Sequence, residues 1–329
     1  MLSGVPQGSV IGPVLFVCFI NDLPEAISSL IYLYADDAKI FRRADDDIDR
    51  LALQRDLEQL ERWADKWQMR FNVGKCKVLH VGGDRNVKAS YYMGLSTDGA
   101  RIKLQETLEE KDLGVWMDGT CRLSNHIAHA VCKANQILGL IRRSFIYIDC
   151  SLMRLLFTSL VRPHLEYGNV VWYPYLQRDI ELLESVQHRA TRLVPGLAKL
   201  TYEDRLRKLN LPTLVYRRHR GDMIETYKYM NGVYHVDSSQ LLPRYEEKCL
   251  KTRGHSKKLM KREFRGQIRE NVFGMRVVNE WNSLPEDVVS APSVSRMKGR
   301  FDMYFAHNKF SMKWKSSGSL TGNSNDKGH

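Results

Sequence analysis

Two neighbouring carboxylates carry the clearest chemical signal in this sequence. The segment YADD at 34–37 lies between two short apolar runs, Leu30–Tyr34 and Ala38–Phe41, so the pattern predicts a tight hairpin with Asp36 and Asp37 at its tip. Adjacent carboxylates repel each other unless a cation or a partner neutralises them. Oxygen ligands in this arrangement suit Mg²⁺, and a solvated acidic turn explains the same four residues equally well.

A glycine-rich motif precedes this pair and also has a spacing that suits ligand binding. Gly4 and Gly8 flank Pro6 and Gln7 in the segment GVPQGS at 4–9. Glycines allow the backbone to approach a flat or charged ligand closely, and the glutamine amide supplies both a donor and an acceptor. Taken alone, the segment also fits an ordinary turn.

The bulk composition favours a polyanionic partner. The 329 residues suffice for two or three domains, and 50 Lys+Arg against 38 Asp+Glu leave a net charge of +12. The six cysteines are scattered without a CxxC pair, which argues against a disulfide framework and a zinc ribbon. The apolar run Val10–Ile20 is too short to span a bilayer and no targeting segment is visible. We therefore expect an intracellular protein, nuclear or cytoplasmic, without a membrane partner.

The first hundred or so residues mix strands with helices. Asp45–Trp67 has apolar residues at helical spacing and an acidic start, which predicts an amphipathic helix. Lys77–Val81 is typical of a strand, and Tyr91–Met93 with Arg101–Leu104 of a hairpin.

After Asp118 the pattern becomes almost wholly helical. Ser124 is predicted to cap a helix whose buried stripe is Ile127, Val131, Ala134, Leu138 and Ile141. The opposite, polar face of that helix should carry His126, His129, Lys133, Gln136 and Arg143. Further helices are expected over Ser151–Val161 and Asp179–Val194, separated by a loop containing Pro163 and Tyr173-Pro174, and from Thr213 to Asn231. Because Cys132 does not share the face of the two histidines, a zinc site with Cys121 is not favoured.

A basic stretch follows the helices. Nine Lys/Arg and one acid lie between Lys248 and Arg269, among them Lys257, Lys258, Lys261 and Arg262. The stretch fits either a nucleic-acid-binding surface or a solvated face, and we favour binding. Residues 311–329, rich in Ser, Gly, Lys and Asn, are predicted to be a disordered tail.

The two chemical motifs together, in this order, resemble the palm of a reverse transcriptase from a non-LTR (LINE-like) retrotransposon. The segment from GVPQGS through INDLP at 20–24 resembles motif B of that family, and YADD resembles the box with two of its three catalytic aspartates. FNVGKCK at 71–77 is similar to motif D, and DLGV at 112–115 to the primer-grip segment. YGNVVW at 167–172 and ESVQHRA at 184–190 resemble the region after the palm, so the likeness extends to about residue 305.

The resemblance implies an RNA-directed DNA polymerase that works by two-metal nucleotidyl transfer with Mg²⁺ or Mn²⁺. Asp36 and Asp37 would be the catalytic metal ligands, with Lys75 as a proton donor or charge partner of the pyrophosphate. The partners implied are an RNA template, an RNA–DNA hybrid and deoxynucleoside triphosphates; no protein partner can be inferred. The residues implied to contact nucleotide or template are Gly4, Pro6, Gln7, Gly8, Ser9 and Tyr34, those of the primer grip are Leu113, Gly114 and Val115, and those facing the nucleic-acid backbone are His126, His129, Lys133, Arg143, Lys257, Lys258, Lys261 and Arg262.

The predicted fold class is α+β. Residues 1–118 would form a partial reverse transcriptase palm, 119–200 a helical thumb, 201–310 a helical basic C-terminal region and 311–329 the tail. In the family, the fingers and a strand with a third catalytic aspartate precede motif B, and we expect both to be missing before Gly4. We therefore expect this chain to be inactive as a polymerase by itself. The alternative function is a non-catalytic, nucleic-acid-binding remnant of a retroelement.

Overall fold

The computed structural model describes residues 8–82, 88–245 and 254–311. The chain divides into an N-terminal unit, Met1–Glu110 with Asp118–Cys121, and a C-terminal unit, Lys111–Met117 with Arg122–His329. The N-terminal unit combines helices with short strands, and the C-terminal unit consists mainly of helices. The α+β class expected from the sequence fits this mixture. None of the helices among the described residues is long and apolar enough to cross a membrane.

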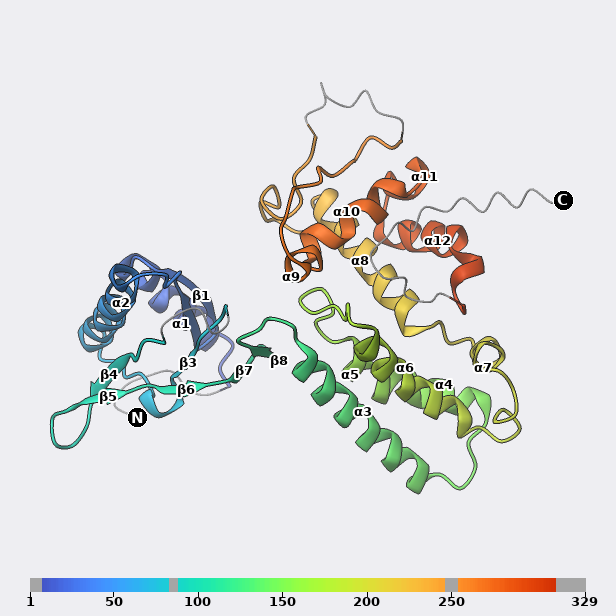
Figure 1. The fold of residues 1–329 in the computed structure, drawn as a ribbon, viewed down its shortest axis with the longest axis horizontal. Helices are drawn as coiled ribbons and strands as arrows, with labels where there is room; N and C mark the ends of the chain where they lie inside the picture. The colour runs from blue at the N-terminus through green and yellow to red at the C-terminus, as the bar shows by residue number, and fades with distance from the viewer. Residues whose placement is uncertain (1–7, 83–87, 246–253, 312–329) are drawn as a thin grey trace. The chain divides into compact units, whose positions relative to one another are not determined.

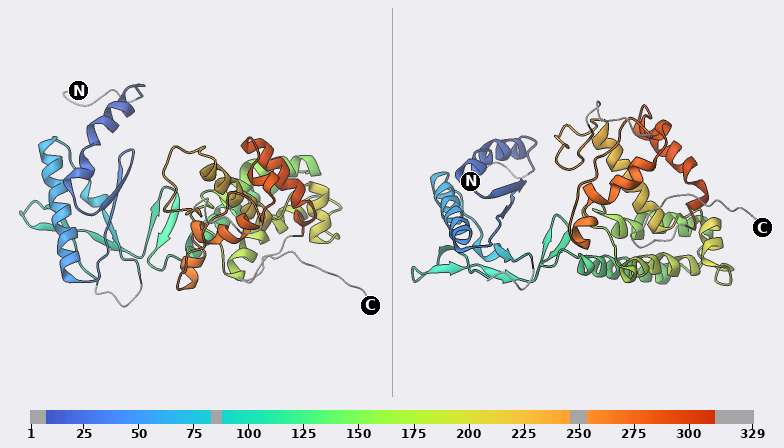
Figure 2. Two further views of the ribbon diagram at one scale, coloured as in Figure 1. Left: turned by 90° about the horizontal axis from the view of Figure 1, so that it is seen from above. Right: turned by 45° about the horizontal axis from the view of Figure 1, so that its top comes forward.

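The N-terminal unit is built from short strands around one long helix. Figures 1 and 2 show α1 and the β1–β2 hairpin side by side, next to α2. Strands β1 and β2 pair antiparallel, β4 and β5 pair antiparallel, and β3 and β6 pair parallel. The predicted hairpins and the predicted long helix are confirmed. The bounds are α1 Gly12–Ile20, β1 Leu30–Tyr34, β2 Asp37–Phe41, α2 Asp47–Lys66, β3 Lys77–Leu79, β4 Tyr92–Leu95, β5 Arg101–Lys103 and β6 Gln105–Thr107, followed by β7 Glu109–Asp112 and β8 Val115–Asp118.

Helix α2 supplies the core of this unit because its apolar residues recur at helical spacing. Asp46 caps the helix by accepting a hydrogen bond from the Asp49 amide at 2.8 Å. The buried stripe packs against the end of α1 and against the strands that follow α2, and it consists of Leu57, Leu60, Trp63 and Ala64.

The regular secondary structure of the C-terminal unit is mainly helical in its described residues. Figure 1 shows α3 alongside α5 and α6, while α8 lies beside α10 and α12. One apolar cluster joins α3 to α7 and a second joins α8 to α12. The bounds are α3 Ser124–Ser144, α4 Cys150–Leu156, α5 Arg162–Glu166, α6 Gln177–Arg192, α7 Tyr202–Leu209, α8 Leu214–Met230, α9 Gln267–Glu270, α10 Phe273–Ser283, α11 Glu286–Val289 and α12 Val294–Tyr304.

Two predicted boundaries in this unit are wrong. Ser124 does not cap α3: it is the first helical residue, and its hydroxyl donates to the Asp179 carboxylate at 2.7 Å. Pro163 does not end the helix that begins at Cys150, because a π-helical turn over Phe157–Val161 joins α4 to α5. A proline lacks an amide proton, and a local change in hydrogen-bond spacing before it lets the helix continue.

Charged side chains tie α8 to distant parts of the C-terminal unit. Arg276 on α10 donates two hydrogen bonds of 2.9 Å to the Asp222 carboxylate, and both side chains are buried. Arg217 pairs with Glu166, and Arg220 with Asp302. These pairs join α8 to α5, α10 and α12, so they fix elements that are far apart in the sequence.

Candidate active site

The two catalytic candidates lie where the β1–β2 hairpin reverses direction. Tyr34 is opposite Asp37 in the antiparallel register, so the connection consists of Ala35 and Asp36 alone. Ala35 has a φ of 51°, in the left-handed region that alanine rarely adopts. A two-residue connection needs a positive φ in its loop, and this strained backbone turns both carboxylates into solvent.

The hairpin has one face toward the core and one toward solvent. Ile31, Leu33 and Ile40 are partly buried against the apolar cluster of the N-terminal unit. Tyr32 and Tyr34, which alternate with them, are 62% and 66% exposed. The Tyr34 side chain, a nucleotide-contact candidate, therefore lies on the open face next to the carboxylates.

The foot of the hairpin is fixed by a carboxylate that sequence reasoning missed. Asp56, buried on α2, accepts the amide hydrogens of Ser28 and Ser29 at 2.9 and 2.8 Å, as well as both serine hydroxyls. Burial alone would raise the pKa of Asp56, but these four donors outweigh it and hold the pKa below its ordinary value. Asp56 lies within the apolar stripe of α2, one residue before Leu57, and a lone charge in such a stripe was the signal that could have revealed it.

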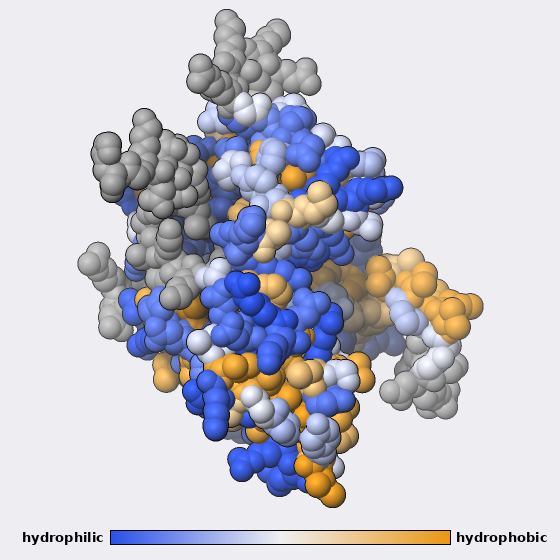
Figure 3. Space-filling view, turned by 90° about the vertical axis from the view of Figure 1, so that its right-hand side faces the viewer, coloured by the Kyte–Doolittle hydropathy of each residue, from blue (hydrophilic) through white to orange (hydrophobic). Residues whose placement is uncertain are grey.

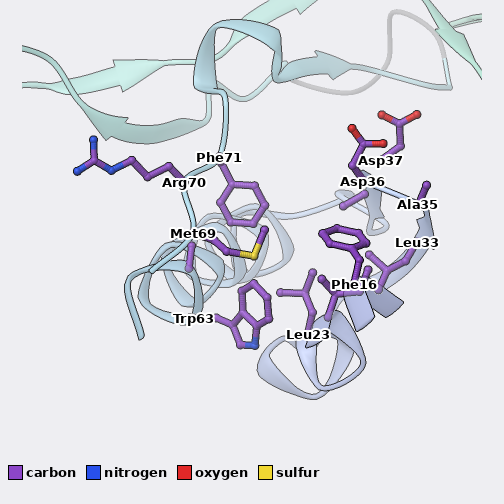
Figure 4. A pocket seen from close by; sticks show the side chains of 13 residues that line it. Phe16, Leu23, Leu33, Ala35, Asp36, Asp37, Trp63, Met69, Arg70 and Phe71 are labelled. Carbon is purple, nitrogen blue, oxygen red and sulfur yellow. The ribbon is translucent and has the colours of Figure 1, made fainter. Parts of the chain in front are cut away.

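A hollow with an apolar floor lies behind the hairpin tip. Its lining includes Asp36 and Asp37, and Figure 4 shows these two side chains at one rim with the aromatic rings of Phe16 and Phe71 below them. Arg70 also lines the hollow, but its guanidinium points away from the carboxylates in Figure 4. Sequence reasoning had not singled out Arg70, and it named Phe71 only as the first residue of the segment that resembles motif D.

The other described candidates of the palm, Gly8, Ser9 and Lys75, do not line the hollow beside the two carboxylates. Lys75 is exposed at the end of a 3₁₀ turn and does not line the hollow. Gly8 has a φ of 85°, and the Ser9 hydroxyl accepts the Gly12 amide hydrogen at 3.0 Å, which shapes the start of α1. Gly4, Pro6 and Gln7 lie outside the described residues.

The primer-grip candidates form the tip of a second hairpin, in the C-terminal unit. Leu113 and Gly114 connect β7 to β8 with φ values of 44° and 87°. The Tyr167 hydroxyl donates to the Leu113 carbonyl at 2.9 Å, and its ring lies so close to Gly114 that a Cβ atom there would be 2.9 Å from it. A glycine is therefore needed at position 114, because the backbone has a positive φ there and the Tyr167 ring leaves no room for a side chain. Val115, the third primer-grip candidate, is buried.

The basic face predicted for α3 is only partly correct. His129, Lys133 and Arg143 are exposed. His126 is 5% exposed: its Nδ1 accepts the Trp116 amide hydrogen at 3.2 Å and its ring meets the edge of Trp172. Burial, with a smaller contribution from His129, lowers the pKa of His126 to about 4, so this side chain is a neutral packing residue. The expectation that His126 lies on the polar face is wrong.

The basic stretch near residue 260 also divides into two kinds of residue. Lys261 and Arg262 are exposed. Lys257 is half-buried and donates to the Asn231 side chain, and Lys258 is half-buried as well. Part of the stretch, residues 248–253, lies outside the described residues.

The described residues contain no larger cluster of side chains that are typical metal ligands. Within 8–82, 88–245 and 254–311, no three His, Cys, Asp or Glu side chains are grouped closely enough to hold a metal ion. Asp36 and Asp37 remain the candidate metal ligands, as a pair.

Comparison with known proteins shows which sequences this chain resembles. Residues 2–117 match the family described as reverse transcriptase (RNA-dependent DNA polymerase). The chain is 26% identical over 245 residues to the RNA-directed DNA polymerase from mobile element jockey of Drosophila melanogaster, a match covering 69% of this chain and 25% of that protein. Probable RNA-directed DNA polymerases of the same species, from transposon X-element and transposon BS, are 23% and 25% identical, over 59% and 79% of this chain and 22% and 30% of their own lengths.

The match over residues 2–117 and the similarity to RNA-directed DNA polymerases of mobile elements are what the sequence predicted. The chain spans about a quarter of the length of the jockey relative. No solved structure matches it.

Proposed function

We propose that this chain contributes the metal-binding end of the palm of an RNA-directed DNA polymerase, with Asp36 and Asp37 as its metal ligands. The observation that carries the proposal is the two-residue reversal at Ala35 and Asp36, which presents two adjacent carboxylates on a strand pair anchored in the core. This hairpin lies inside the segment that matches the reverse transcriptase family.

The residues present suit a divalent cation of the Mg²⁺ type. Mg²⁺ in polymerase sites is typically held by one or two carboxylates together with substrate phosphates, and it keeps several waters. Asp36 and Asp37 are exposed and free to share such an ion with a nucleotide. When bound, the ion would neutralise phosphate charge during nucleotidyl transfer. The chain's own part is to hold the two carboxylates at a fixed spacing, through the strained turn and the Asp56 anchor.

The proposal extends to the elements around the hairpin. Tyr34 would contact the incoming nucleotide or template from the exposed face, and Lys75 would act on the pyrophosphate. The N-terminal unit would be the palm part, and helices α3 to α6 the thumb. Nucleic acid would meet the exposed cations of α3 and of the basic stretch, through contacts with phosphates rather than bases.

Metal binding can be tested in the purified chain, independently of polymerase activity. When Fe²⁺ replaces Mg²⁺ in the presence of ascorbate and peroxide, we expect backbone cleavage within a few residues of Asp36, mapped by mass spectrometry. Excess Mg²⁺ should suppress the cleavage. Asp36→Asn with Asp37→Asn should abolish it, because the amides are weak ligands for hard cations.

Asp46→Asn with Asp47→Asn is the matched control, because it neutralises another exposed acidic pair of the same unit. This variant should be cleaved near Asp36 as the wild type is. Cleavage that survives the loss of Asp36 and Asp37, or that maps to 45–47, would refute the proposed metal site.

Binding of nucleic acid should depend steeply on salt, because each neutralised phosphate releases counterions. We expect Lys261→Gln with Arg262→Gln to reduce the log–log slope for an RNA–DNA hybrid by up to about 1.8, at about 0.9 per lost contact. Neither change should alter base preference. The measurement is fluorescence anisotropy over a series of salt concentrations.

Arg296→Gln with Lys298→Gln on α12 changes the net charge equally and should leave the slope unaltered. Lys257 and Lys258 of the same stretch are left unchanged, because these half-buried side chains have contacts within the protein and replacing them would confound binding with stability. Equal slopes for the two double variants would mean that the basic stretch is only a solvated surface.

A further inference from the structure

The loop between α3 and α4 exposes three consecutive large side chains, which we call the α3–α4 tip: Phe145, Ile146 and Tyr147. Their exposed fractions are 38%, 109% and 69%. Single exposed apolar residues are common on protein surfaces, but an uninterrupted run of three is unfavourable in water and unusual without a binding role.

The residues on both sides of the tip are fixed by hydrogen bonds and by packing. The Phe145 amide donates to the Ile141 carbonyl at 3.2 Å and closes α3, and Ile148 is buried in the apolar cluster of the unit. The Asp149 carboxylate then caps α4 by accepting the Leu152 amide hydrogen at 2.7 Å. The three side chains between these anchors are therefore presented to solvent by the fold.

Three arginines flank the tip in the sequence. Arg142 and Arg143 end α3, and Arg154 lies on α4; all three are exposed. No carboxylate in the described part of the chain pairs with any of them. Asp149, the one acid in the segment 140–156, is occupied by its capping bond. Figure 3 shows apolar and hydrophilic side chains next to one another at the lower end of the face in view.

We propose that the α3–α4 tip binds single-stranded nucleic acid. Phe145 and Tyr147 would stack on unpaired bases, while Arg142, Arg143 and Arg154 contact the phosphates on either side. Aromatic platforms beside cationic side chains are the arrangement by which proteins hold single strands without reading sequence. A symmetric contact between two copies of this chain would instead bring six arginines together, which like-charge repulsion disfavours.

The tip belongs to the C-terminal unit and Asp36 and Asp37 to the N-terminal unit, so binding at the tip can be tested whether or not the polymerase proposal holds. The probe is a 12-nucleotide single strand with one 2-aminopurine, made as RNA and as DNA, and mixed with the full chain. Stacking on an aromatic ring should quench the 2-aminopurine fluorescence. Since each stacked base contributes about 5- to 100-fold in affinity, Tyr147→Ser should weaken binding by at least about 5-fold and reduce the quenching.

Three further variants separate stacking from charge and from folding. Tyr147→Phe should bind as the wild type does, because it keeps the ring. Arg142→Gln with Arg143→Gln should reduce the salt slope by about 0.7 for each lost contact on a single strand, whereas Tyr147→Ser should leave the slope unchanged. Tyr304→Ser on α12 is the control, since Tyr304 is 51% exposed and lies outside the tip.

Two results would overturn the proposal. One is equal affinity and equal quenching for Tyr147→Ser and Tyr304→Ser with both RNA and DNA. The other, from sedimentation at several protein concentrations, is a dimer that Tyr147→Ser disperses while nucleic-acid binding stays unchanged, which would assign the tip to a second copy of the chain. A difference between the RNA and DNA probes would show which strand the tip prefers.

Discussion

Asp36→Asn should abolish RNA-templated primer extension in a polymerase that uses residues 2–117 of this chain. The test protein is a chimera in which this segment replaces the aligned segment of the Drosophila melanogaster jockey polymerase. Loss of a carboxylate that holds a catalytic ion removes several kcal/mol of charge stabilisation in the transition state, so extension should fall roughly a thousandfold or more.

The control for this experiment is Asp45→Asn, which removes an exposed carboxylate near the same hairpin but away from its tip. It should leave extension within about twofold of the unsubstituted chimera, because exposed surface substitutions rarely disturb a site. A chimera that folds and binds the hybrid but extends no primer would count against the proposed function. Undiminished extension by Asp36→Asn would exclude the metal role of that residue.

Arg276→Ala should give the largest loss of stability in the C-terminal unit. Arg276 donates to Asp222, to the carbonyls of Asn169 and Val170, and lies over the ring of Tyr173 at 4.6 Å. Removing it leaves a buried carboxylate without its partner, which typically costs about 3–5 kcal/mol. Chemical denaturation followed by circular dichroism should show an earlier unfolding transition.

Arg276→Lys separates charge from geometry, since a lysine keeps the charge but cannot form the paired bonds to Asp222. It should be destabilising, though less so than Arg276→Ala. Arg178→Ala serves as the surface control, because the Arg178 side chain is 72% exposed. If Arg276→Ala and Arg178→Ala unfolded at the same denaturant concentration, the buried pair would not be holding α10 to α8.

The sequence predicted those features that depend on local pattern. The alternation of apolar residues around Asp36 and Asp37 was sufficient to place the hairpin, and the apolar spacing in 45–67 was sufficient to place α2. The buried stripe of α3 was predicted for the same reason. Each of these follows from a repeat of two or of 3.6 residues, which is visible without knowledge of the fold.

The features that were missed depend on partners remote in the sequence. His126 was placed on a polar face because its neighbours His129 and Lys133 are polar, but Trp172 covers it. The partners of Asp56 are 27 and 28 residues earlier, and the Tyr167 hydroxyl reaches the Leu113 carbonyl across 54 residues. Helical periodicity assigns residues to faces, but it does not say which faces another element will cover.

The π-helical turn before Pro163 was missed for a different reason. A proline in a helical pattern is normally taken as a boundary, since it removes one backbone donor. Here the hydrogen-bond spacing changes over Phe157–Val161 and the helix continues to Glu166. Composition gives no sign of such a local change, because it requires only a small rearrangement of the backbone.

The ion pairs around α8 have a consequence for how the C-terminal unit responds to heat. Arg217, Arg220 and Arg276 each hold a carboxylate from another helix. Removing charges from water is less unfavourable as temperature rises, because their hydration carries a strongly negative entropy. Contacts of this kind therefore weaken less on warming than contacts between weakly packed apolar surfaces. The helices joined by α8 are the part of the chain in which we expect order to persist longest as the temperature is raised.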